Sequence, residues 1–575
     1  MPTSTVIVRR SLPDFADLPG SPLLQRIYAG RGVRSAEELD LRLALLPSPA
    51  TLKGITEAVN LLETALRQRW RITIVADLDA DGATSCALAT RALRALGAAE
   101  VNYVVPNRFV HGYGLTPEIV EVAAREQPDL LITVDNGMSS TEGVKTAHAL
   151  GIRVLITDHH LPGATLPEAD ALVNPNQPGD AFPGKQLAGV GVIFYVLSAL
   201  RTRLRESGWF AAHGLPDPNM AQFLDLVAVG TVADVVSLAQ INRVLVDQGL
   251  RRIRQGRCVP GIAALFTVAG RSMARATAGD IGFQLGPRLN AAGRLADMSL
   301  SIECLLCDDP ARALHLAQEL NRLNGERRVI ETDMKAQALE HLDRLPLDDC
   351  ELPFGLCLFD PGWHQGVVGI LAGRIRERVH RPVIAFAPDS HDGLLRGSAR
   401  SVPGLHIRDV LAAVDVRQPD LIARFGGHAA AAGLSLLPTH LPAFQSAFDA
   451  EVRRQLRPED INGNLWSDGE LEAAEISLDT ADQLRDAGPW GQGFPEPLFD
   501  GVFDVVSHRV MKEQHLKFSL RSPEMKQAIE AVAFNRVGDF IPGTKRLQIA
   551  YRLDVNEWRG ERRLQLMVAH LEPAG

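Results

Sequence analysis

Apolar and polar positions follow a regular pattern between residues 71 and 175. Short apolar runs occur at 71–76, 101–106, 130–135 and 153–158 (RITIVA, VNYVVP, LLITVD and RVLITD), and ADALVNP at 169–175 is a candidate for one more. Helix-like segments separate these runs, at 83–97, from about Thr116 onward and at 141–151. Strands of five or six residues separated by helices predict a parallel, Rossmann-like sheet.

The pattern changes further along the chain. Residues 311–342 contain no proline and one glycine, which predicts a long connecting helix, and an apolar helix running into a loop is expected after Met220. A second α/β unit begins near Gly355 with FGLCLFD, VVGILAGRIRERV and PVIAF. From about residue 460, short alternating segments such as HLKFSL and RLQIAYRLD predict a small antiparallel β-barrel of the OB kind.

These patterns predict an α/β protein that ends in an OB-like β-barrel. We expect the first residues to pack on the parallel sheet as an extension. The predicted domains are an N-terminal extension at 1–45, a parallel-sheet domain at 46–270, a connecting segment with the long helix at 271–345, a second α/β domain at 346–455 and the OB-like domain at 456–575.

The composition is typical of a globular protein with several domains, since 46% of the 575 residues are hydrophobic and 22% are charged. No segment resembles a signal peptide, and no run approaches the roughly 20 apolar residues of a membrane helix. Six scattered cysteines fit reduced thiols, so we expect a cytoplasmic protein without membrane association. The pair Cys304 and Cys307 has no second pair nearby and is interpreted as core.

The net charge of −9 excludes a protein that binds DNA through a uniformly basic surface. Charge is distributed unevenly, however. Residues 248–279 contain six arginines and no acidic residue. Such a segment either lines a path for phosphates or forms a solvated surface, and the pattern alone does not decide between the two.

Carboxylates gather where the predicted strands end. Asp77, Asp79 and Asp81 follow the first strand at every second position, and they would repel one another unless a cation compensates. An EF-hand loop is excluded, because the twelfth residue from Asp77 is Leu88 and not glutamate.

The later strands repeat this theme. They end in Asp135 and in Asp158, His159 and His160, and Asp234 interrupts an apolar run downstream. Ligand sites in open parallel sheets form just beyond the carboxyl ends of the strands. Carboxylates with imidazole suit Mn²⁺ or Mg²⁺, and the number of donors is enough for two ions. Paired ions activate a water molecule and stabilise the leaving oxygen in phosphodiester cleavage.

In order and spacing, the chain resembles the DHH phosphoesterase superfamily in four motifs, DLDADG, VDNG, TDHH and GTVAD. It is similar to the companion DHHA1 domain in FDPGWHQGVVGILAGR, RGSARS and FGGHAAAAG. Further segments, among them GFQLGPRLNAAGR, LNRLNGERRVIE and GPWGQGFPEPLFD, resemble the exonucleases of that superfamily that act on single-stranded DNA. The resemblance covers roughly residues 50–570.

The resemblance implies roles for particular residues. The metal ligands would be Asp77, Asp79, Asp81, Asp135, His159 and Asp234. Asp158 would orient a histidine, and His160 would act near the scissile phosphate as a donor or a further ligand. The substrate-binding residues would be Arg108, Arg288, Asn290, Arg294, Ser398, Arg400 and His428. Of these, Ser398 and Arg400 would hold the 5′-terminal phosphate, since an arginine fork binds phosphate oxygens in pairs.

The resemblance further implies a metal-dependent exonuclease that degrades single-stranded DNA in the 5′→3′ direction to 5′-mononucleotides, in DNA repair and recombination. A monomer is expected, with a single-strand-binding protein and a helicase as partners. The OB-like domain would hold the strand by stacking bases on aromatic residues. Trp490, Phe518 and Trp558 are candidates for stacking or for core, and core is favoured for Phe518.

Two other functions stay open. A DHH phosphodiesterase for short RNA or cyclic dinucleotides would share the acidic motifs, but such enzymes are usually much shorter and lack the OB-like domain. A binding module that has lost catalysis would lack part of the ligand set, whereas all four acidic motifs are intact here.

Overall fold

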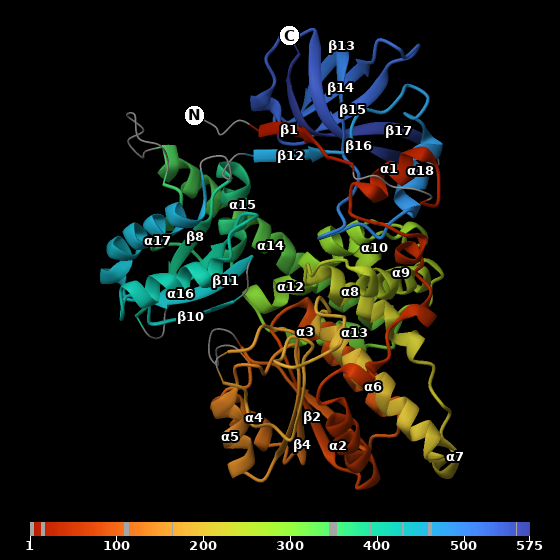
Figure 1. The fold of residues 1–575 in the computed structure, drawn as a ribbon, viewed down its shortest axis with the longest axis vertical. Coiled ribbons are helices and arrows are strands. Elements are labelled where there is room, and N and C mark those ends of the chain that lie inside the picture. The colour runs from red at the N-terminus through yellow and green to blue at the C-terminus, as the bar shows by residue number, and fades with distance from the viewer. Residues whose placement is uncertain are drawn as a thin grey trace. The chain divides into compact units, whose positions relative to one another are not determined.

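The computed structural model describes residues 5–12, 18–107, 114–163, 165–343, 353–389, 393–427, 430–457, 463–558 and 561–574. The chain divides into two compact units (Figure 1). One consists of Met1–Asp40 with Asn462–Gly575, and the other of Leu41–Ile461. Within the described ranges, no helix has the length and apolar character needed to cross a membrane.

The first sheet of the larger unit is parallel throughout, as predicted. Its strand order is β3 (Glu100–Val104), β2 (Arg71–Ala76), β4 (Leu130–Val134), β5 (Arg153–Thr157) and β6 (Ala171–Val173). All of β4 is buried, as expected for a strand covered on both faces. Figure 1 shows α4 (Pro117–Ala124) and α5 (Thr141–Ala149) on one side of the sheet, with α2 (Ile55–Arg67) and α6 (Gly189–Glu206) on the other.

The strand order reverses between β2 and β4, because β3 lies on one side of β2 and β4 lies on the other. Ligands of such sheets bind in the crevice at this reversal, beyond the carboxyl ends of the strands. Asn136 joins the two strand ends: its Nδ2 donates hydrogen bonds of 3.0 Å to the carbonyls of Val75 and Val134. The side chain of Asn136 therefore fixes the spacing of the two segments that carry Asp77 and Asp135.

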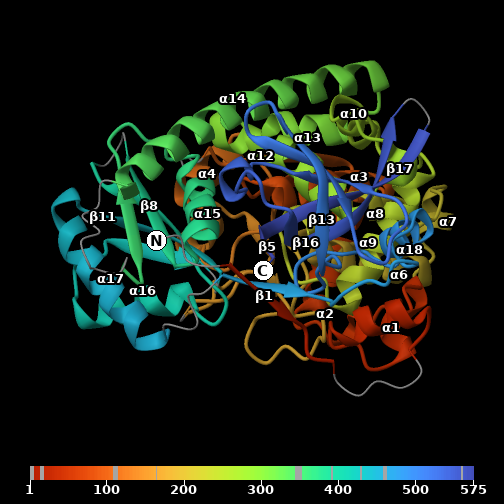
Figure 2. The ribbon, with the colours of Figure 1, turned by 90° about the horizontal axis from the view of Figure 1, so that it is seen from above.

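Helices follow the sheet. They are α8 (Leu224–Ala233), α9 (Gln240–Arg254), α10 (Pro260–Val268), α12 (Gly286–Leu295), α13 (Ser299–Leu306) and α14 (Pro310–Asp343). The predicted long helix is α14, which contacts α10, α12 and α13 and, toward its end, α15 (Val368–Val379) (Figure 2). Cys304 is buried on α13, in line with the core interpretation, whereas Cys307 is only half-buried; neither forms a disulfide.

The second α/β region contains a mixed sheet in the order β10 (Arg424–Gly427), β11 (Ala431–Leu436), β9 (Leu395–Arg400), β8 (Val383–Pro388) and β7 (Leu356–Phe359). Neighbouring residues of β8 point to opposite faces. Ile384 and Phe386 pack with residues of α16 (Ile407–Arg417) and α17 (Leu441–Gln455), whereas Val383 and Ala385 pack with α15. Both faces of this sheet are therefore covered.

The smaller unit contains the OB-like β-barrel. Its strands pair in the order β13 (Phe499–Met511), β14 (His515–Arg521), β15 (Ile529–Ala533), β17 (Glu561–Pro573) and β16 (Arg546–Trp558), and β16 pairs with β13. Phe518 is 2% exposed in the barrel core, as favoured from the sequence. Trp490 packs against that core, and its indole donates to the carbonyl of Leu484. The side chain of Trp558 lies outside the described part.

The expectation that the N-terminal segment packs on the parallel sheet is wrong. Strand β1 (Thr5–Arg9) pairs in parallel with β12 (Gly463–Ser467), and Leu23 and Ile27 belong to the barrel core. The buried guanidinium of Arg31 donates to both carboxylate oxygens of Asp468, at 2.8 and 3.0 Å. A buried arginine needs such a partner, and this one lies over 400 residues away in sequence. The remaining domain limits stay predictions.

Candidate metal centre

The turn after β2 places two carboxylates by hydrogen bonds. Asp79 caps α3 (Ala80–Ala95), since its carboxylate accepts from the amides of Asp81 and Gly82 at 2.9 and 3.1 Å. Asp81 is fully buried and accepts from the amides of Gly189 and Val190 at 2.6 and 3.0 Å, at the start of α6. The positive end of a helix thus holds the Asp81 carboxylate in place.

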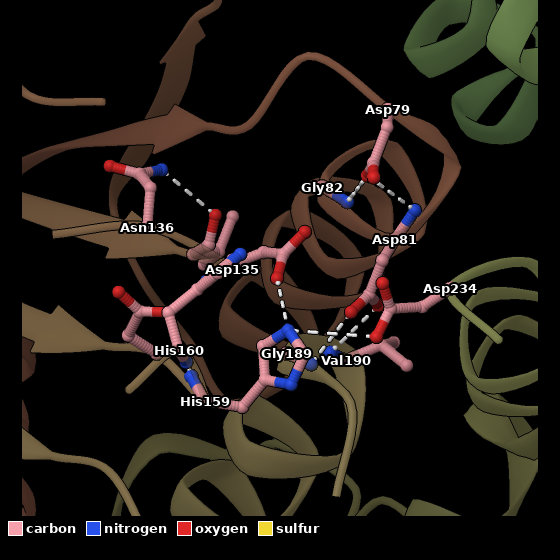
Figure 3. Close-up of polar contacts among 12 residues, drawn as sticks. Asp79, Asp81, Gly82, Asp135, Asn136, His159, His160, Gly189, Val190 and Asp234 are labelled. Atoms are coloured by element: carbon pink, nitrogen blue, oxygen red, sulfur yellow. Dashed lines mark hydrogen bonds and ion pairs between the residues drawn. The ribbon is translucent and has the colours of Figure 1, made fainter. Parts of the chain in front are cut away.

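Three more side chains converge on this turn from other elements (Figure 3). His159 Nε2 lies 3.1 Å from Asp135 Oδ1 and 3.6 Å from Asp234 Oδ2. Asp135 follows β4 with a φ of 63°, a left-handed conformation that side-chain-bearing residues adopt infrequently, and Asp234 ends α8. The three segments are far apart in sequence but meet at the reversal of the sheet.

The structure brings together all six residues predicted as metal ligands. Three overlapping groups have ligand atoms within 4.8 Å of one another: Asp77, Asp79 and Asp135; Asp81, His159 and Asp234; and Asp135, His159 and His160. The groups share Asp135 and His159, so the donors form one continuous cluster. Such a set offers enough donors for two adjacent ions.

Two glycines allow the helices to approach this cluster closely. A Cβ at Gly189 would lie 2.6 Å from Asp135 Oδ1, and one at Gly230 would lie 2.8 Å from Asp81 Oδ1. Neither distance is compatible with a side chain. These glycines, like the strand-joining Asn136, were not identified from the sequence, although GVG at 189–191 and VGT at 229–231 contain them.

The carboxylates of the cluster disfavour one another's charge. Burial raises the pKa of Asp81 to about 7, with the charge of Asp234 adding to the shift. Burial, followed by the charge of Asp79, likewise raises the pKa of Asp234 to about 7. The pKa of Asp135 is raised well above its ordinary value, by burial and then by the charge of Asp81.

Buried like charges of this kind require either protons or a cation. Oxygen donors with one or two imidazoles are the ligands that Mn²⁺ and Mg²⁺ prefer. His159 supports this fit, because burial, followed by the charge of His160, lowers its pKa and so favours the neutral imidazole that binds metal. The residues present therefore fit divalent metal.

Asp158 serves a different purpose from the other carboxylates. Its Oδ1 accepts from Nδ1 of His160 at 2.7 Å and its Oδ2 accepts from the amide of Met138 at 2.9 Å. Burial opposes the charge of Asp158, but the charge and hydrogen bond of His160 hold its pKa well below the usual range. Burial also opposes the charge of His160, yet Asp158 raises the pKa of His160 to about 10. Asp158 thus favours the protonated form of His160 and fixes the orientation of its ring.

The predicted substrate residues on α12 make contacts within the larger unit. Asn290 Oδ1 accepts from the amide of Ala80 at 2.8 Å, which attaches α12 to the turn with Asp79 and Asp81. Arg294 donates to the carbonyl of Gly366 at 3.1 Å. Arg288 is 6% exposed and donates to Asn321 Oδ1 of α14 at 3.0 Å.

The roles of these three residues in substrate binding stay predictions. Arg108 and His428, also predicted to bind substrate, lie outside the described residues.

Ser398 and Arg400 belong to β9, and their side chains lie beside the first turn of α15. A Cβ at Gly369, in the first turn of that helix, would lie 2.8 Å from Ser398 Oγ and 2.7 Å from Arg400 Nη2. Arg400 Nη1 donates to Ser398 Oγ at 3.1 Å. Burial, with a contribution from the charge of Arg376, lowers the pKa of Arg400 to about 10. A guanidinium, a hydroxyl and a helix N-terminus together form a favourable place for an anion.

Family models match three segments of the chain: the DHH family N-terminal domain at residues 71–231, the DHHA1 domain at 353–454 and the RecJ OB domain at 467–570. The single-stranded-DNA-specific exonuclease RecJ of Dickeya dadantii is 52% identical over 570 residues, which cover 98% of this chain and 99% of that protein. The chain belongs to the RecJ family. The RecJ of Escherichia coli is 50% identical, with 98% of each chain covered.

Solved structures agree with this assignment. RecJ of Thermus thermophilus in complex with Mn²⁺ matches with a TM-score of 0.78 and 33% identity, over 98% of this chain and 79% of that one. The same RecJ in complex with Mg²⁺ matches with a TM-score of 0.72 and 31% identity, over 98% and 78% of the two chains. The resemblance drawn from the sequence motifs is confirmed.

Proposed function

We propose that this chain is a metal-dependent exonuclease that degrades single-stranded DNA in the 5′→3′ direction and releases 5′-mononucleotides. The observation that carries the proposal is the pairing of a carboxylate–imidazole centre with an anion site across a single helix, α12. RecJ relatives that match the chain over nearly its whole length are named for single-stranded-DNA-specific exonuclease activity.

The six converging side chains are the proposed ligands of two Mn²⁺ or Mg²⁺ ions: Asp77, Asp79, Asp81, Asp135, His159 and Asp234. When bound, such ions supply an activated water molecule and stabilise the leaving oxygen. The protein's contribution is to hold carboxylates that repel one another at the end of a rigid sheet. The complexes of the Thermus RecJ with Mn²⁺ and with Mg²⁺ support this choice of ions.

His160 is the proposed donor to the scissile phosphate. Asp158 fixes its Nδ1 and keeps the ring positively charged, so Nε2 carries a proton. A positioned imidazolium neutralises negative charge that develops on a phosphate oxygen during cleavage. Asp158 acts through His160 and is therefore a positioning residue.

The anion site of Ser398 and Arg400 is the proposed binding site of the 5′-terminal phosphate. The structure links it to the metal centre through α12, where Asn290 contacts the Asp79–Asp81 turn and Arg294 contacts Gly366 before α15. Asn290 and Arg294 are four residues apart, about 6 Å along a helix. One helix therefore contacts the neighbours of both sites and connects them.

Wider features of the proposal come from the family. We propose that the protein acts as a cytoplasmic monomer in DNA repair and recombination, with a helicase and a single-strand-binding protein as partners. Support comes from the RecJ relatives, whose stated substrate is the one that these partners would produce or coat.

The catalytic part is tested with Asp234→Asn, which replaces a ligand by a side chain of the same shape. It should abolish release of nucleotides from single-stranded DNA in Mn²⁺ or Mg²⁺ while leaving binding of the strand intact. Asp225→Asn is the matched control, because Asp225 is a buried carboxylate at the other end of α8 that accepts from the amide of Val259. Full activity of Asp234→Asn would overturn the proposed metal site.

A further inference from the structure

An aromatic side chain is exposed close to the metal centre. Phe283 is 77% exposed and lies in η6 (Ile281–Leu285), a π-helical turn directly before α12. π-helical turns are rare in proteins, and those that occur are often found at functional sites. Single exposed apolar side chains are common on protein surfaces, so the exposure of Phe283 gains meaning only from the turn that carries it and from its neighbours.

The turn that carries Phe283 packs on the end of α8. A Cβ at Gly282 would lie 3.4 Å from Val232 Cγ1, and one at Gly286 would lie 3.2 Å from Ala233 Cβ. The next residue after Ala233 is Asp234, one of the proposed ligands. The backbone at Phe283 is therefore within about one helical turn of the segment that delivers Asp234 to the centre.

The surroundings of Phe283 are positively charged. Arg288 Nη1 donates to the carbonyl of Gln284, the neighbour of Phe283, at 2.7 Å. Burial lowers the pKa of Arg288, and the charges of Arg328 and Arg271 lower it further, so the three guanidinium groups are close enough to repel one another.

Two structural details support this cluster. Arg328 is seven residues beyond Asn321 on α14 and so lies on the helix face that bonds to Arg288. Nε of Arg271 lies 3.7 Å from Oδ1 of Asp280, and this carboxylate offsets part of the repulsion among the arginines. Arginines close to a turn that carries an exposed aromatic ring match the chemistry of a nucleic-acid strand.

We infer that Phe283 is a stacking platform for a base of single-stranded DNA, with the exposed Arg271 and Arg328 along the phosphates on either side and the buried Arg288 holding the turn against α14. The inference rests on the proposed function and adds the residue that holds a base beside the metal centre. Stacking on an aromatic ring tolerates every base, as a nuclease that digests any sequence requires. Part of the arginine-rich segment 248–279 then lies along the path of the phosphates, through Arg271.

Binding of 5′-phosphorylated single-stranded oligonucleotides, followed by fluorescence anisotropy in EDTA, tests this role without cleavage. Phe283→Ala should weaken binding about tenfold, within the range expected for loss of one stacked base. Phe283→Leu, which keeps the apolar side chain but loses the aromatic face, should be equally weak, and Phe283→Trp should bind at least as tightly as the wild type. Val416→Ala, at a residue of α16 that is 79% exposed, is the matched control and should bind normally.

A series of oligonucleotides with one abasic site at successive positions separates stacking from a change of fold. One position should weaken binding by the wild type and leave Phe283→Ala unaffected. Binding by Phe283→Ala or Phe283→Leu equal to that of Val416→Ala would overturn the inference. It would also be overturned if an abasic site weakened binding by Phe283→Ala as much as binding by the wild type at every position.

Failure of the proposed function gives a different result. A wild-type protein that binds in the expected pattern but releases no nucleotides with Mn²⁺ would contradict the nuclease proposal and leave the stacking intact.

Discussion

Asp158 accepts a hydrogen bond of 2.7 Å from Nδ1 of His160, and the same carboxylate oxygen accepts from the amide of His159 at 2.7 Å. One buried side chain therefore fixes both the ring of His160 and the backbone that aims the two histidines. The adjacent imidazoles lie beyond the last residue of β5, Thr157, where the alternation of strand faces no longer applies. This arrangement explains how two neighbours in sequence both reach the centre.

Asp158→Asn should reduce the rate of DNA cleavage about 10–100-fold, the usual effect of losing a partner that orients a group at a metal site. The amide has the shape of the carboxylate but neither its charge nor its preference for an imidazolium. The measurement is kcat/KM on a single-stranded oligonucleotide. Asp170→Asn removes a similar carboxylate from a surface pair with His148, at 3.0 Å, and is the matched control. Equal activity of the two variants would contradict the role of Asp158.

Gly189→Ala should destabilise the protein by about 1–3 kcal/mol, as overpacking of a filled interior does. The new Cβ would meet Asp135 Oδ1 at 2.6 Å, so the affinity for Mn²⁺ should fall as well. Denaturant unfolding and Mn²⁺ titration measure the two effects. Gly325→Ala is the control, because a Cβ there meets nothing within 4 Å in the middle of α14 and should stabilise by up to about 1 kcal/mol. A tolerated Gly189→Ala with normal Mn²⁺ binding would contradict the packing argument.

Metal removal should expose the repulsion within the cluster. Mn²⁺ should raise the melting temperature of the wild type in a concentration-dependent way, because it binds the folded state. Asp234→Asn should be more stable than the wild type in EDTA at pH 8, since one repelling carboxylate is gone, yet it should gain little from Mn²⁺. Thermal unfolding with EDTA and with Mn²⁺ checks both statements. A lower melting temperature for the variant in EDTA would contradict the assigned repulsion.

The stability of the metal-free protein should fall as the pH rises from about 4 to about 7. Folding raises the pKa of Asp81 and Asp234 from 3.8 to about 7, so the folded state holds protons that the unfolded chain has already lost in this range. Stability decreases with pH wherever the folded state binds more protons, and His160, whose pKa folding raises from 6.5 to about 10, continues the decline above pH 7.

Saturating Mn²⁺ should reverse that trend, because the ion replaces the protons and binds more tightly as they leave. Melting temperatures between pH 5 and 8.5, with EDTA and with Mn²⁺, provide the test. The same slope under both conditions would show that these carboxylates do not titrate as described.

Sequence pattern was sufficient for the strands of the parallel sheet and for most of the acidic cluster. The strands at 71–76 and 130–135 are buried apolar runs, and a parallel sheet necessarily brings the residues that follow them to one edge. Asp77, Asp79, Asp81, Asp135 and His159 could therefore be grouped before any distance was known, whereas Asp234, at the end of a helix, was assigned through the resemblance to the DHH superfamily. The long helix was equally predictable, since residues 311–342 lack proline.

Features that depend on close contact between distant segments were not predictable. Nothing local to Gly189 or Gly230 indicates that a Cβ there would lie within 3 Å of a carboxylate, because Asp135 and Asp81 come from other elements. The pairing of β1 with β12 likewise joins segments over 450 residues apart. Exposure of Phe283 follows from the packing of a π-helical turn, and a phenylalanine in an apolar segment is ordinarily expected inside.

The central claim is the direction and product of DNA digestion, and one experiment measures both. Single-stranded oligonucleotides labelled at the 5′ or the 3′ end, with a blunt duplex and a short RNA beside them, are digested in Mn²⁺ or Mg²⁺ and the products are resolved by length. The account predicts that the 5′ label leaves first, as a mononucleotide, while the 3′-labelled strand shortens stepwise and the blunt duplex stays intact. Release of the 3′ label first, or equal attack on the blunt duplex, would contradict it.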